Sequence, residues 1–194
     1  IGQYGIHDFE TSMEALAYYT QFGSSEFAIR EFLKHDFDKT LEVMKVWAES
    51  PNHHIRRLAS EGCRPRLPWA MAIPELKKNP EPILSLLNVL KSDPSEYVRR
   101  SVANNLNDIA KDNPQLVIEI ASQWKGHTKE TDAIIKHACR TLLKQGNIEI
   151  LKHFGLDSSK VAVSNLKIHT PEVAIGNHLE FSFSIQNNDE KPQT

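Results

Sequence analysis

The residues whose types and spacing could do chemistry begin in the segment 61–69, which reads EGCRPRLPW. Arg57 and Glu61 are four residues apart, a spacing that places both on one face of a helix. Arg100, Asn104 and Asp108 share a face in the same way. Carboxylates on such faces can stabilise positive charge or activate water, and arginines can bind phosphate. An isolated Arg57–Glu61 pair is also typical of an ordinary helix surface, where it contributes only about 0.3–0.5 kcal/mol.

A rigid, basic turn follows the first of these helices. Gly62 ends or bends the helix, and Pro65 and Pro68 prevent it from continuing. Arg64 and Arg66 alternate with the prolines. Such a turn can present guanidinium groups to phosphates and hold a nearby aromatic side chain close to a carboxylate.

The aromatic side chain in question is Trp69, which we expect to open the next helical stretch. Its alternative role is that of a core anchor. For Trp47 and Trp124, at the ends of predicted helices, the core position is the preferred interpretation.

Charge is unevenly distributed along the sequence. The net charge is −2, but residues 54–109 hold nine Lys and Arg against six Asp and Glu, a local balance of +3. A basic stripe inside a nearly neutral chain can be a phosphate-binding face. On charge alone, a solvated face with ordinary ion pairs is the preferred interpretation.

Composition excludes several classes of protein. With 40% hydrophobic and 25% charged residues, the chain is typical of a soluble globular protein. No apolar run reaches the roughly 18 residues that a membrane helix needs, and no signal-peptide pattern opens the sequence, so no membrane partner is expected. Cys63 and Cys139 form neither a metal pattern nor a disulfide framework, which favours a reducing cytoplasm. No histidine pairs with cysteine or carboxylate at ligand spacing, so no metal and no cofactor are expected.

Helix-start signals recur through the first three quarters of the chain. Each places a capping side chain before a proline, which can occupy the first helical position without losing a hydrogen bond. Apolar residues of helical period follow each of these signals. The signals are Ser50-Pro51, Asn79-Pro80, Asp93-Pro94 and Asn113-Pro114.

These helices repeat. Residues 50–62 align with 93–105 without a gap, at an offset of 43, and a third unit follows around 134–138. Residues 36–47 and 112–124 resemble companion helices of two such units. Periods near 40 with two helices each are the signature of HEAT-like solenoids. The sequence therefore predicts an all-α, HEAT-like helical-repeat solenoid, an α-α superhelix running from about residue 7 to 154.

Composition changes after the helical region. VAVSNLKI and LEFSFSIQN alternate apolar and polar residues, and Ile175-Gly176-Asn177 supplies a turn. Two or three strands cannot form an independent core, so we interpret them as the start of a β-sandwich. The predicted domains are 1–157, the helical array, and 158–194, a partial β-domain. Because the chain begins at Ile1, we expect the first domain to be incomplete at its N-terminus.

Two long runs carry a family resemblance. RRLASEGCRPRLPWA (56–70) and SDPSEYVRRSVANNLNDIAKDNP (92–114) closely resemble the HEAT-like-repeat alkylpurine DNA glycosylases, particularly the AlkC branch. The resemblance covers essentially the whole helical region. It also implies that the β-domain is immunoglobulin-like, because many proteins of that branch carry such a domain after the solenoid.

The resemblance implies an activity and a site. The activity is excision of positively charged bases such as 3-methyladenine and 3-methylcytosine from double-stranded alkylated DNA, by a monomer. The family's carboxylates and tryptophan map onto Glu26, Glu61, Trp69 and Asp108; Glu26 could instead be a first-turn residue favoured by the helix dipole. We assign water activation to Asp108 and charge stabilisation to Glu61. Phosphate contacts are assigned to Arg57, Arg64, Arg66 and Arg100.

Two other functions fit a solenoid. The first alternative is a non-catalytic HEAT-like scaffold that binds nucleic acid or protein, because fold does not determine function. A scaffold, however, has no need to keep the Glu61-to-Trp69 turn together with Asp108. An RNA-binding solenoid would carry a one-base-per-repeat code, and none is present.

Overall fold

The computed structural model describes residues 1–156 and 161–188. The chain divides into two compact units, Ile1–Ile150 and Leu151–Thr194. The boundary predicted between residues 157 and 158 lies outside the described residues. No helix among those described is long and apolar enough to cross a membrane.

Helices make up most of the chain as far as residue 153, as the sequence predicts. In chain order they are α1 (Phe9–Tyr19), α2 (Glu26–His35), α3 (Phe37–Trp47), α4 (His53–Gly62), α5 (Pro74–Lys78), α6 (Glu81–Leu90), α7 (Glu96–Ile109), α8 (Pro114–Trp124), α9 (Lys129–Ala138), α10 (Arg140–Lys144) and α11 (Ile148–His153).

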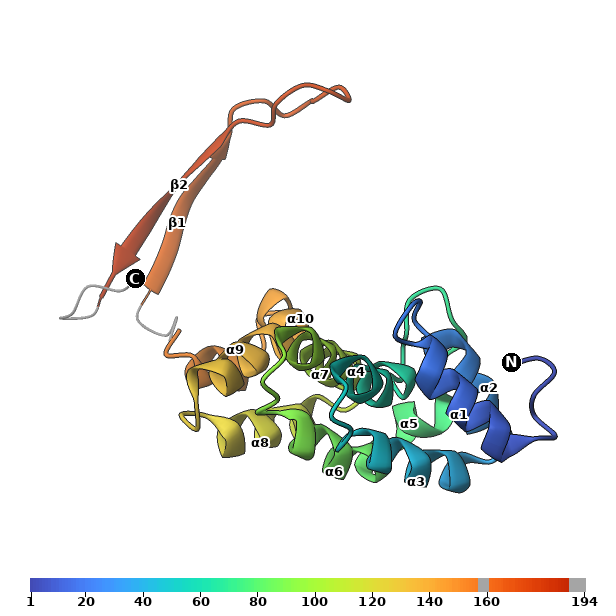
Figure 1. The fold of residues 1–194 in the computed structure, drawn as a ribbon. Helices are drawn as coiled ribbons and strands as arrows, with labels where there is room; N and C mark the ends of the chain where they lie inside the picture. The colour runs from blue at the N-terminus through green and yellow to red at the C-terminus, as the bar shows by residue number, and fades with distance from the viewer. Residues whose placement is uncertain (157–160, 189–194) are drawn as a thin grey trace. The chain divides into compact units, whose positions relative to one another are not determined.

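The helices stack in two rows, as Figure 1 shows. α3, α6 and α8 form one row, and α4, α7 and α9 form the other, with α7 packed between α4 and α9. Fully buried side chains such as Leu58, Val98 and Val102 fill the space between the rows. The aligned segments 50–62 and 93–105 thus lie in neighbouring helices, which confirms the predicted helical repeat. Each pair buries its apolar face only against its neighbours.

The proline signals mark helix starts less directly than predicted. Only α8 begins at its proline, Pro114. α4 and α7 begin two residues after theirs, because side chains cap a preceding turn: Asp93 accepts a hydrogen bond from the Ser95 backbone N–H at 2.8 Å and is also bound by Arg56. Asn52 caps α4 instead, accepting from the His54 N–H at 2.9 Å.

The second unit contains an antiparallel pair of strands, β1 (Val161–Ile168) and β2 (Phe181–Asn187). The register is irregular between Ser164 and Lys167, where Asn165 adopts a left-handed φ of 56°. The predicted strands are therefore confirmed. Residues 161–188 form a single two-stranded sheet, and the immunoglobulin-like sandwich stays a prediction.

Candidate active site

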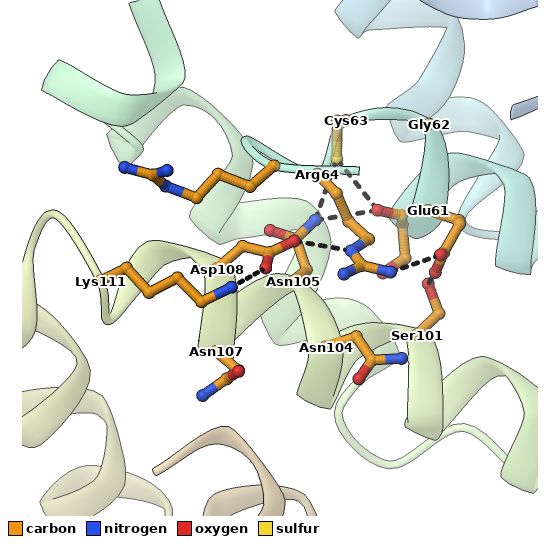
Figure 2. A network of polar contacts seen from close by, with 12 residues as sticks. Glu61, Gly62, Cys63, Arg64, Ser101, Asn104, Asn105, Asn107, Asp108 and Lys111 are labelled. Carbon is orange, nitrogen blue, oxygen red and sulfur yellow. Dashed lines mark hydrogen bonds and ion pairs between the residues drawn. The ribbon is translucent and has the colours of Figure 1, made fainter. Parts of the chain in front are cut away.

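Two carboxylates from neighbouring repeats share one guanidinium. Arg64 donates from an NH group to Oε1 of Glu61 at 2.6 Å and from Nε to Oδ2 of Asp108 at 2.8 Å (Figure 2). The exposed fractions are 5% for Glu61, 6% for Arg64 and 1% for Asp108. Glu61 comes from the last turn of α4 and Asp108 from the last turn of α7, so stacking of the two repeats assembles the pair. We call these three residues the carboxylate cluster.

The remaining carboxylate oxygens also have donors. Ser101 donates to Oε2 of Glu61 at 2.7 Å, and Lys111 donates to Oδ1 of Asp108 at 3.0 Å. Burial opposes the charge of Arg64, but its contacts with Asp108 and Glu61 outweigh burial and raise the pKa of its guanidinium. Every oxygen of the pair is therefore held in a fixed orientation by a hydrogen bond.

A buried arginine, which the sequence did not predict, holds the turn after α4 in place. Arg30 of α2 donates to the backbone carbonyls of Gly62 at 3.0 Å, Arg64 at 2.8 Å and Met71 at 3.0 Å. Burial lowers the pKa of this guanidinium. The only signal in the sequence was an arginine between the apolar residues of a predicted helix, a pattern that usually places the charge at the surface.

Gly62 also has a packing role. α4 ends there, as predicted, and a Cβ at this position would lie 2.5 Å from Cγ2 of Ile29 and 3.3 Å from Cε of Met44. The missing side chain lets α4 approach α2 closely enough for Arg30 to reach the turn carbonyls.

Trp69 does not open a helix. α5 begins only at Pro74, and Trp69 lies in the preceding turn with a left-handed φ of 62° and 99% of its surface exposed. The prolines and the carbonyl contacts of Arg30 fix the backbone path of this turn, so no helix begins at residue 69. Trp69 is therefore not a core anchor, whereas Trp47 and Trp124 are buried as predicted.

The contacts in the described residues do not link Trp69 to either carboxylate. Glu26, by contrast, is connected to the cluster through Arg57, which contacts Oε2 of Glu26 and lies 3.4 Å from Oε1 of Glu61. Glu26 is also the first residue of α2, so it occupies the first-turn position as well. Charges consequently alternate along one row: Glu26, Arg57, Glu61, Arg64, Asp108 and Lys111.

The four arginines predicted to bind phosphate differ in their surroundings. Arg64 is buried, and its donors are directed at Glu61 and Asp108. In this structure it therefore holds the carboxylate cluster together and is not available to bind phosphate. Arg66 is partly exposed and binds Asp112 through two hydrogen bonds, at 2.8 and 2.6 Å. Arg57 is half-buried, and Arg100 is exposed.

Beneath the cluster, Cys63 is fully buried, and burial raises the pKa of its thiol to about 12. A thiol with that pKa carries almost no thiolate at neutral pH, so it is no nucleophile. Asn105 donates to the Ser60 carbonyl at 2.8 Å and to the Cys63 sulfur at 3.4 Å, which ties α7 to α4. In the part of the chain that the structure describes, His, Cys, Asp and Glu do not gather as a metal site.

The fold and the cluster define a helical-repeat protein with a buried, arginine-bridged carboxylate pair. The model of the DNA alkylation repair enzyme family matches residues 17–142, and the chain belongs to this family.

Two relatives match most of the chain. The uncharacterized protein YhaZ of Bacillus subtilis (strain 168) is 48% identical over 186 residues, 95% of this chain and 52% of the relative. The solved structure of the Pseudomonas fluorescens alkylpurine DNA glycosylase AlkC, bound to DNA containing an abasic site analog, is 45% identical. It superposes with a TM-score of 0.92, covering 99% of this chain and 54% of that one. The chain thus spans about half the length of these relatives.

A third likeness covers a smaller part of the chain. The solved structure of AlkD2 from Streptococcus mutans is 37% identical with a TM-score of 0.51, over 59% of this chain and 54% of that one.

Proposed function

We propose that this protein is a DNA glycosylase of base excision repair, acting as a monomer on double-stranded alkylated DNA. It hydrolyses the N-glycosidic bond of positively charged bases, 3-methyladenine and 3-methylcytosine. Family membership and the likeness to a glycosylase solved on DNA support the reaction class. The observation that carries the proposal is the arginine-bridged pair of Glu61 and Asp108.

Hydrolysis of the N-glycosidic bond of such a base is helped by two fixed carboxylates. A methylated base with a positive charge is already a good leaving group, so little acid catalysis is needed. Breaking its glycosidic bond puts positive charge on the deoxyribose, as in other glycoside hydrolyses. A fixed carboxylate stabilises that charge, and a second one orients or deprotonates the attacking water. Glu61 takes the first role and Asp108 the second, and neither role uses a cofactor.

Access to Asp108 requires one movement. Its Oδ1 is covered by Lys111, whose side chain is 39% exposed, while its Oδ2 is held by buried Arg64. A long, solvent-facing lysine leaves its partner at little cost, whereas a buried arginine does not. Lys111 is therefore the group that moves aside when the sugar and its water approach.

The remaining predicted residues serve recognition. Trp69 offers its π face to the sugar or to the cationic base, an attraction of about 0.5–2 kcal/mol. Arg57, Arg66 and Arg100 bind phosphates, which makes the affinity for DNA fall as salt rises. Glu26 adds a third carboxylate at the far end of the charge row.

The test is release of 3-methyladenine and 3-methylcytosine from methylated duplex DNA. Asp108→Asn lowers the rate by roughly 10²–10⁴-fold, and Glu61→Gln also lowers it, because each removes a charge that the transition state uses. Glu42→Gln is the control, since it removes a surface carboxylate bound to Lys45, away from the cluster and from the arginines assigned to phosphate. If both site variants excise as fast as wild type, the mechanism is wrong.

The alternative is a non-catalytic HEAT-like scaffold that binds nucleic acid or protein. The saturation of every cluster oxygen by a donor favours it, because buried ion pairs also serve to fix a fold. Wild-type protein that binds duplex DNA but releases no base from it would establish the scaffold.

A further inference from the structure

Asn104 lies one turn before Asp108 on α7 (Figure 2). Its side-chain amide is held at one end. Its Oδ1 is 2.8 Å from Nε2 of His137 and 3.3 Å from an NH group of Arg140. A guanidinium only donates, so the contacted atom is the amide oxygen and Nε2 of His137 carries a proton. Burial, helped by the neighbouring charges of Arg140 and Arg100, lowers the pKa of His137 and so favours its neutral ring.

The other end of the same amide is unused. Nδ2 of Asn104 carries two N–H donors, and neither has a hydrogen-bond partner within residues 1–156 and 161–188. Arg100 lies one further turn back on this face, exposed, and makes no ion pair or hydrogen bond within the described ranges. Residues four apart on a helix are neighbours, so the free amide lies between a free guanidinium and Asp108.

The repeat offset shows what is unusual here. At the offset of 43, Arg57 and Glu61 of α4 correspond to Arg100 and Asn104 of α7. In α4, Oε1 of Glu61 lies 3.4 Å from an NH group of Arg57 and partly neutralises its charge. In α7, an amide replaces the carboxylate, which removes a negative charge and adds two donors. The second repeat therefore offers positive charge and N–H groups where the first offers a carboxylate.

Arg100 also lines a groove of about 380 Å³ between α7 and α9. Arg99 and Lys129 line the same groove, together with Glu96 and Glu130, and these side chains form no ion pair with one another in the described structure. The groove can therefore receive an anion at its Arg100 end, while the charge of Asp108 keeps that anion off the carboxylate cluster.

We propose that Asn104 and Arg100 together bind one DNA phosphodiester, beside the sugar on which Asp108 acts. His137 and Arg140 are positioning residues that aim the amide of Asn104. This inference rests on the proposed function for its choice of DNA as ligand. It adds a substrate-positioning contact on α7 and a reason for the half-buried polar pair behind it.

The first experiment measures binding of a labelled duplex containing an uncleavable abasic-site analog, by fluorescence anisotropy. Asn104→Asp keeps an acceptor for His137 and Arg140 but sets a negative charge against the phosphate, so binding weakens on the order of tenfold or more. Asn104→Ala weakens binding less. Asn88→Asp, which adds the same charge at an exposed position of α6, is the control. Wild-type affinity in Asn104→Asp overturns the proposal.

The second experiment uses salt dependence to test for a shared phosphate. Arg100→Gln lowers the slope of log affinity against log salt by about one phosphate contact. Arg99→Gln is the matched control, because its guanidinium is already bound to the carbonyls of Asp93 and Pro94. The double variant of Asn104→Ala with Arg100→Gln costs less than the sum of the two, because both contact one group. An unchanged slope in Arg100→Gln contradicts the proposal.

The third experiment tests positioning. His137→Leu weakens DNA binding in the wild-type background and has no further effect in the Asn104→Ala background, where no amide remains to aim. Equal losses in both backgrounds would mean a merely structural role and overturn the assignment. Since binding to the abasic analog needs no base release, a protein that excises nothing but loses affinity in Asn104→Asp would fail the glycosylase proposal and retain this one.

Discussion

Two parts of the site are opposite in character: the carboxylate cluster, and Trp69 in the turn that follows α4, residues 63–73. In the cluster, Arg64 satisfies Glu61 and Asp108 in a buried network. In the turn, Trp69 is almost wholly exposed on a backbone with positive φ, a conformation that costs a bulky residue about 1–2 kcal/mol. The contrast separates two tasks. The carboxylates of Glu61 and Asp108 are fixed in place by burial and pairing, whereas the Trp69 side chain is exposed to solvent, where it can contact a ligand.

The largest effect is expected from breaking the bridge of the cluster. Arg64→Met leaves two buried carboxylates without their shared partner, which should lower the free energy of unfolding by about 3–5 kcal/mol. Arg66→Met is the matched control, because its pair with Asp112 is partly exposed and should cost about 0–1 kcal/mol. Chemical denaturation measures both. Equal losses would show that the bridge contributes no more than a surface pair.

A smaller effect is expected where the turn is anchored. Arg30→Lys keeps the charge, but one ammonium cannot replace the planar fork that binds the carbonyls of Gly62, Arg64 and Met71. Buried carbonyls left without donors should cost about 1–3 kcal/mol. Thermal unfolding together with limited proteolysis within residues 63–73 measures the loss. A turn as resistant to protease as in wild type would contradict the anchoring role.

Substitutions of Trp69 should separate stability from function. Trp69→Ala should change the free energy of unfolding by less than about 0.5 kcal/mol, because an exposed side chain buries little surface. Trp69→Gly should be more stable than Trp69→Ala by about 1 kcal/mol, since glycine adopts positive φ without strain. Both should excise alkylated bases more slowly than wild type. A large loss of stability in Trp69→Ala would place the ring in a structural role.

The smallest effect concerns the edge of the site. The folded state lowers the pKa of His137 below its usual 6.5, chiefly through burial. In the unfolded chain this histidine therefore binds more protons, so stability is complete above pH 6.5 and falls as the pH drops from there through the folded pKa. NMR titration of the ring measures the pKa directly. His137→Gln should lose this part of the pH dependence, and a pKa above 6.5 would contradict the shift.

Much of the fold could be predicted because it depends on local patterns. The repeated segments at 50–62 and 93–105 predicted neighbouring helices, and they are α4 and α7. The strands after residue 160 followed from alternation of apolar and polar residues. The prolines were a less reliable signal for the first residue of a helix, because Asn52 and Asp93 cap the backbone next to them and shift the helix start.

The candidate site could be predicted only in part. Spacing put Glu61 and Asp108 on polar helix faces, but nothing local indicated that the guanidinium between them would be buried. Arg64 and Arg66 lie on either side of the same residue, Pro65, yet one closes the cluster and the other lies at the surface. Each binds an aspartate more than 40 residues away, Asp108 for Arg64 and Asp112 for Arg66. Such pairings are decided by repeat stacking, which local sequence does not encode.

The bridge made by Arg64 also bears on how the chain opens. Repeat arrays interact only between neighbours, so units can separate one at a time in local unfolding events. Because Arg64 follows α4 and Asp108 lies on α7, parting these two helices takes the carboxylate pair apart while the outer helices stay folded. Amide hydrogen exchange along α7 therefore measures how often the two carboxylates separate. Measurements of global stability do not reveal this local opening.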